Sequence, residues 1–79
     1  MTRANEEWTI EDAIRLNDNE EVVLATRPNK YAPEGIEYVT WFCTNGNNYF
    51  WGHYTFSKKS AKMDLCNRAL KEFERWSDK

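Results

Sequence analysis

Residues 37–44 read EYVTWFCT, residues 45–48 read NGNN, and residues 49–56 read YFWGHYTF. The two outer runs are rich in aromatic and β-branched residues, which favour strands. The Asn-Gly pair between them is typical of a type I′ turn, because both central residues of that turn need a positive φ. The stretch therefore predicts a β-hairpin, with Asn47 and Asn48 leaving a longer loop open.

The predicted hairpin is aromatic on both faces. Side chains alternate along a strand, and a two-residue turn would pair Trp41 with Phe50 and Thr40 with Trp51. The core face would then hold Val39, Trp41, Cys43, Phe50, Gly52, Tyr54 and Phe56. The outer face would hold Tyr38, Thr40, Phe42, Tyr49, Trp51 and His53. Gly52 is expected to leave room for a large neighbour such as Trp41.

The flanking segments complete an α+β fold. Thr9 with Asp12 three residues later predicts the start of a short first helix that ends near Asn17. Residues 21–27 predict a strand, and residues 28–36 a surface loop. Ser57 predicts the cap of a long C-terminal helix. The stripe expected to pack on the sheet is Ala61, Leu65, Cys66, Ala69, Leu70, Phe73 and Trp76.

The predicted order is αβββα, a three-stranded antiparallel sheet with a long C-terminal helix packed on one face. Seventy-nine residues make a single small domain, residues 1–79, in which residues 1–7 are expected to be a flexible N-terminus. A chain this short builds one compact core and leaves little room for a deep substrate cleft.

The chain has no long apolar run, which argues against a signal peptide or a membrane span and favours a cytoplasmic protein. Its net charge of −2 is unevenly distributed. Residues 1–37 contain four basic and nine acidic residues, a net charge of −5, whereas residues 57–79 contain seven basic and four acidic residues, a net charge of +3. Such a difference in sign can orient a charged partner.

Catalytic and metal-binding patterns are missing. His53 is the only histidine, and the predicted register places it on the face opposite Cys43, which argues against a Cys-His nucleophile pair. Both cysteines, Cys43 and Cys66, are expected to be core thiols. The glycines are isolated, so no phosphate-binding loop is present. We expect no enzyme activity, no metal, no cofactor and no small-molecule substrate.

The stretch Ser57-Lys58-Lys59-Ser60-Ala61-Lys62, continued through Arg68-Ala69-Leu70, resembles the start of the second helix in double-stranded-RNA-binding domains. The predicted αβββα order is also theirs. The resemblance implies that Lys58, Lys59 and Lys62 would contact phosphates across the RNA major groove.

Two functional hypotheses follow from the sequence. The first is a non-enzymatic module that binds a protein partner, or a second copy as a homodimer, through Tyr38, Phe42, Tyr49, Trp51 and His53. An accessory or phage-type regulatory protein would suit such a module. The alternative is nucleic-acid binding through Lys58, Lys59 and Lys62. It also remains open whether the N-terminal segment with Trp8 covers the outer aromatic face.

Overall fold

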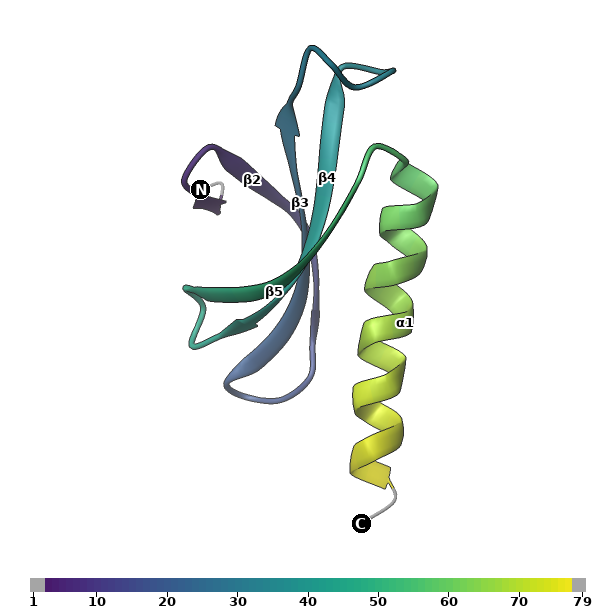
Figure 1. Ribbon diagram of the computed structural model, residues 1–79. Coiled ribbons are helices and arrows are strands. Elements are labelled where there is room, and N and C mark those ends of the chain that lie inside the picture. Colours follow the sequence, from purple (N-terminus) through teal and green to yellow (C-terminus); the bar gives the residue numbers. More distant parts are fainter. Residues whose placement is uncertain (1–2, 78–79) are drawn as a thin grey trace.

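The computed structural model describes residues 3–77 and contains one curled, five-stranded antiparallel sheet with one helix along its convex side (Figure 1). The elements are β1 (Ala4–Asn5), β2 (Trp8–Arg15), β3 (Glu20–Pro28), β4 (Ile36–Thr44), β5 (Asn48–Thr55) and α1 (Lys58–Ser77). Each strand pairs with the next one in the sequence. The α+β class is confirmed, but the predicted three-stranded αβββα order is wrong.

The segment predicted as a first helix forms strand β2. A β-bulge between Ile10 and Asp12 inserts one extra residue into this strand. Ile10 therefore packs on one face of the sheet and Ile14 on the other, although four residues separate them. This interruption removes the strict alternation expected of a strand and leaves a spacing that resembles a short helical stripe. The residues before β2, predicted to be flexible, include β1.

Both faces of the sheet carry a hydrophobic core. The concave core consists of Trp8, Val23, Ala25, Val39, Trp41 and Cys43, with Ile10 and Tyr49 packed against it. The convex core lies under α1 and consists of Val22, Leu24, Tyr38, Ala61, Leu65 and Ala69, with Ile14, Leu16 and Phe42 packed against it. The concave core needs no second helix, because the curl of the sheet brings Trp8 of β2 onto Trp41 of β4, with ring centroids 5.6 Å apart.

The helix covers the face opposite to the predicted one. It packs on Tyr38, which the sequence places on the outer face, and leaves the set around Trp41 to the concave side. Trp8 also lies on that concave side, so it does not cover the predicted outer face. Within the helix, Cys66, Leu70 and Phe73 of the predicted packing stripe are exposed. The side chain of Trp76 lies outside the described part of the structure.

The turn of the β4–β5 hairpin has the predicted backbone, since Asn45 and Gly46 have φ values of 55° and 78°. Strand pairing nevertheless begins one residue later than a two-residue loop would give, with Thr44 opposite Asn48. A shift of one residue exchanges the faces of a strand. As a result Tyr49 lies opposite Cys43 and belongs to the concave side.

A second bulge shifts the register by one more residue further along β5. Phe50 lies opposite Phe42, and His53 lies opposite Thr40, so Trp51 and Gly52 share the single position opposite Trp41. Gly52 is required there. A Cβ at this position would lie 2.8 Å from the indole Nε1 of Trp41. The predicted close approach of Trp41 to Gly52 is therefore confirmed.

We expect Gly52→Ala to destabilise the fold by about 1–3 kcal/mol, because the buried Trp41 indole has no space into which it can move. Urea unfolding followed by circular dichroism measures this change. A midpoint equal to that of the wild type would show that the close approach of Trp41 and Gly52 is not needed.

Candidate interaction surface

The five residues predicted to form one open aromatic face do not lie together on the surface. Tyr38 is only 9% exposed and lies under α1. Phe42 is half-buried in the convex core, and Tyr49 is half-buried on the concave side, where its ring centroid is 5.4 Å from that of Trp41. Trp51, at 72% exposure, and His53 are the exposed members of the set. The predicted single open face is therefore wrong.

Trp51 is presented to solvent by a strained backbone. Its φ is 55°, in the left-handed region that residues with a large side chain rarely adopt. Trp51 lies in the bulge opposite Trp41. Residues in this region cost on the order of 1–3 kcal/mol and persist only where the surrounding structure enforces them, often at binding sites.

The indole of Trp51 stands against two other rings. Its centroid is 5.0 Å from that of Phe50 and 5.7 Å from that of Phe42, both in edge-to-face geometry. Phe42 and Phe50 are also stacked on each other at 6.2 Å. Edge-to-face pairs are favourable beyond the area they bury, so the three rings hold the exposed indole in one orientation.

Arg68 of α1 is hydrogen-bonded to the bulged part of the hairpin. This arginine is only 8% exposed, and its Nη2 donates a hydrogen bond of 2.7 Å to the carbonyl oxygen of Trp51. Its Nη1 donates to both the carbonyl oxygen and the hydroxyl of Thr40, each at 3.0 Å. The guanidinium also lies 4.5 Å from the ring centroid of Phe42. One side chain therefore joins the helix to both strands that flank the bulge.

Asp64, one turn before Arg68, links His53 to this network. Its carboxylate accepts a hydrogen bond from Thr40 and lies 2.9 Å from Nδ1 of His53. Burial alone would raise the pKa of Asp64. The hydrogen bonds from Thr40 and His53 and the charge of Arg68 outweigh that effect and hold the pKa below its ordinary value of 3.8. Burial lowers the pKa of Arg68, and the charge of Asp64 opposes this decrease.

The helix flank beside β5 carries charges of both signs, with Asp64 and Glu72 among three basic residues. Asp64 and Arg68 both contact the strands of the hairpin, which fixes this flank of the helix toward β5. Lys71 and Arg75 follow Arg68 by three and seven residues and so continue the same stripe. Arg75 is exposed and pairs with Glu72 within the helix. Three basic and two acidic residues leave this flank with a small net positive charge.

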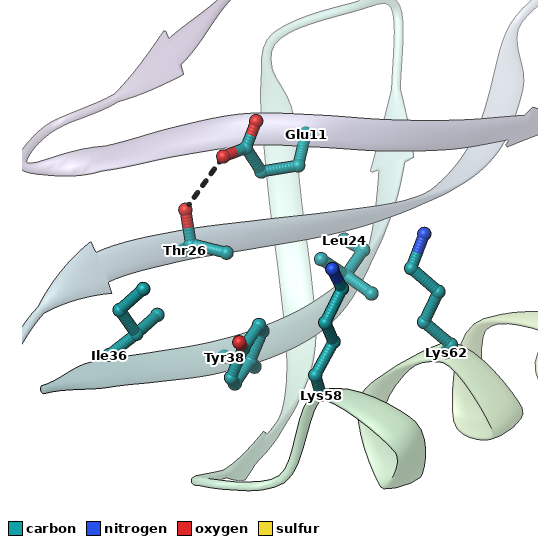
Figure 2. Close-up of a pocket in the computed structure, with 7 residues that line it drawn as sticks. All are labelled: Glu11, Leu24, Thr26, Ile36, Tyr38, Lys58 and Lys62. Carbon is teal, nitrogen blue, oxygen red and sulfur yellow. Dashed lines mark hydrogen bonds between the residues drawn. The ribbon is translucent and has the colours of Figure 1, made fainter. Parts of the chain in front are cut away.

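The three lysines predicted to bind nucleic acid do not all face the same way. Lys58 and Lys62, one turn apart, line a groove that Glu11 of β2 also lines (Figure 2). Lys62 Nζ lies 3.7 Å from a carboxylate oxygen of Asp12. Lys59 does not line the groove, and helical geometry turns it about 100° away from Lys58. Lys58 and Lys62 therefore lie near the carboxylates of Glu11 and Asp12. The αβββα order shared with double-stranded-RNA-binding domains is also not present.

The sequence prediction missed Arg68 and Asp64, which organise the site. A signal for Arg68 exists in the sequence, since it lies between Leu65 and Ala69 on the helix face that packs against the sheet. A charged residue in an apolar stripe is normally paired or hydrogen-bonded. The bulge that frees Trp51 left no comparable signal.

Within residues 3–77, no three His, Cys, Asp or Glu side chains come together as a metal-binding group. No helix in the same range combines the length and apolar character that a membrane span requires. Comparison with protein-family models, with characterised proteins and with solved structures finds no match to this chain. A function for this protein must therefore be argued from the geometry of its surface.

The strain at Trp51 predicts an unusual order of stability among substitutions. Trp51→Asn should be more stable than Trp51→Val by about 1 kcal/mol, because Asn tolerates a positive φ and a β-branched residue does not. Chemical unfolding of both variants measures the difference. The matched pair Tyr54→Asn and Tyr54→Val, at an exposed position in the same strand without positive φ, should show Val at least as stable as Asn. If Asn and Val rank in the same order of stability at both positions, the backbone at Trp51 is not strained.

The lowered pKa of Asp64 predicts a pH-dependent contribution to stability. A carboxylate with a depressed pKa stabilises the fold above its unfolded-state pKa, and that contribution is lost as the pH falls through the folded-state value. Asp64→Asn should therefore be less stable than the wild type at neutral pH, with the gap narrowing between about pH 5 and about pH 2. Thermal unfolding across this range tests it, and a gap that stays constant would contradict the role of the charge.

Proposed function

We propose that this protein is a small non-enzymatic interaction module that binds a protein partner through Trp51. The observation that carries the proposal is the combination of high exposure and enforced strain at one tryptophan. An indole at 72% exposure on a left-handed backbone is held by Arg68 and by two neighbouring rings. Tryptophan is among the residues that most often dominate binding energy at protein interfaces.

The surroundings of Trp51 indicate the chemistry of the partner. The indole and the exposed part of Phe50 would fill an apolar pocket. Lys71 and Arg75 on the adjacent helix flank would face carboxylates at the edge of that pocket. We therefore infer a partner with an apolar pocket bordered by acidic residues. Because the anchor is already held in place by Arg68, little conformational entropy is lost when it binds.

A reducing compartment suits this module, and we place it in the cytoplasm as part of the proposal. Cys43 is buried in the concave core and Cys66 is exposed on the helix, so the two thiols are free and belong to separate elements. An exposed free thiol persists where the cell keeps cysteines reduced. The thiols take no part in the proposed contact.

The test compares Trp51→Ala with Tyr31→Ala, a control that removes an even more exposed ring, at 81%, from the loop between β3 and β4. Proteins captured by the wild type are purified and titrated against all three. We expect Trp51→Ala to weaken binding by about 30-fold, the loss typical of a hot-spot residue worth roughly 2 kcal/mol. The far-ultraviolet circular dichroism should not change.

Two further measurements sharpen this test. Binding should weaken as salt is added, because Lys71 and Arg75 contribute to the proposed contact. In a Trp76→Phe background, bound partner should protect the fluorescence of Trp51 from acrylamide, since Trp8 and Trp41 are already buried. A partner that binds Trp51→Ala as tightly as the wild type would reject the proposal. Sedimentation that shows a dimer abolished by Trp51→Ala would make a second copy the occupant and reject the acidic partner.

A further inference from the structure

A groove of about 320 Å³ lies between the start of α1 and the convex face of the sheet (Figure 2). Its floor is formed by Leu24 of β3 and by Ile36 and Tyr38 of β4. The volume is at the lower end of the roughly 300–1,000 Å³ that is usual for ligand sites. The groove lies beside the first two turns of α1. Trp51 lies beside the third turn, where Arg68 binds its carbonyl oxygen.

The groove exists because the strands continue past the start of the helix. β3 and β4 pair as far as Pro28 and Ile36, whereas α1 contributes no core side chain before Ala61. In Figure 1 the ends of both strands project beyond the first turn of α1. The apolar face at that end of the sheet is consequently only partly covered.

The Tyr38 hydroxyl has no protein partner in this groove. Tyr38 is 91% buried, and within residues 3–77 no hydrogen bond joins its hydroxyl to another group. No side-chain nitrogen or oxygen in this range is both fully enclosed and unpaired, so the hydroxyl is accessible to solvent on a residue that lines the groove. A buried phenol normally finds a hydrogen-bond partner. A ligand atom would supply the partner that the protein does not.

Two ammonium groups lie on the helix side of the groove. Figure 2 shows Lys58 and Lys62 extending from the first turns of α1 toward the strands. Lys58 forms no ion pair with any residue in the range 3–77, and Lys62 makes only the 3.7 Å contact with Asp12. The first turn of α1 contains no acidic residue, so its positive end is not neutralised locally. This end of the groove favours an anion.

A carboxylate on the wall formed by β2 favours an anion with a single negative charge. Thr26 donates a hydrogen bond of 3.2 Å to the carboxylate of Glu11, which leaves a negative group on the far wall. Repulsion from a fixed carboxylate is twice as large for a dianion as for a monoanion at the same distance. A single carboxylate therefore fits the groove better than a phosphate.

We propose that this groove binds a monocarboxylate with an apolar body. The carboxylate accepts hydrogen bonds from the Tyr38 hydroxyl and from Lys58, Lys62 adds positive charge at the same wall, and the apolar body packs on Leu24 and Ile36. The sequence singled out Lys58 and Lys62, but the other residues of this site come from three strands and follow no motif. The binding does not depend on the Trp51 surface and would remain if that surface proved inactive.

The test titrates 3-phenylpropionate into the isotopically labelled full chain and follows the amide resonances of Leu24, Ile36 and Tyr38. We expect saturable shifts with a Kd on the order of 1 mM for so small a ligand. The neutral 3-phenylpropanamide, which has the same shape, should bind at least 10-fold more weakly. Peptides with a C-terminal leucine, free or amidated, show whether a free acid or a peptide terminus binds more tightly.

Three variants assign the contacts. Tyr38→Phe removes only the hydroxyl and should weaken 3-phenylpropionate about 5-fold, and Lys58→Gln should weaken it about 10-fold. Lys59→Gln, the matched control outside the groove, should leave the Kd unchanged. Equal binding of acid and amide, equal effects of Lys58→Gln and Lys59→Gln, or the absence of saturable shifts would each overturn the proposal.

Discussion

The guanidinium of Arg68 is the interaction on which the arrangement of helix, bulge and exposed tryptophan depends. It is buried between α1 and the sheet and donates to backbone carbonyls of Thr40 and Trp51, one on each side of the β4–β5 pairing. A buried arginine is tolerated only where its charge and its donors are satisfied. Asp64 balances the charge, and the carbonyls occupy the donors. The bulge and the helix position therefore stabilise each other.

Local signals predicted most of the elements. Asn45 and Gly46 adopt the turn backbone that their residue types favour, and Ser57 caps α1 through a hydrogen bond from the amide of Ser60 to its hydroxyl. β2 could not be predicted in the same way. Its bulge breaks the period of two, and its pairing with β3 is not visible in residues 9–17 taken alone. Tertiary pairing here overrides the helix-start pattern at Thr9.

The faces of the hairpin were harder to predict than its strands, because both faces are apolar. Hydrophobic pattern fixes the register of a strand only when one face is polar. Here either set of rings could have met the helix. The choice is set by features outside the hairpin, namely Trp8 and Ile10 of β2, which complete a concave core around Trp41, and the small residues Ala61 and Ala69, which let α1 approach Tyr38. The exposure of Trp51 then follows from the bulge, which the residue types did not indicate.

The two proposed sites share α1 but need not influence each other. The groove lies at Lys58 and Lys62, and the support for Trp51 comes from Arg68, so about 15 Å of helix separates their extremes. Coupling between sites at such a distance requires an element with two arrangements whose balance both ligands change. α1 is fixed at Arg68 by three hydrogen bonds and packed through Ala61, Leu65 and Ala69, which provides one arrangement and no alternative. Occupation of the groove should therefore leave the affinity at Trp51 unchanged, and the free energies of the two events should add.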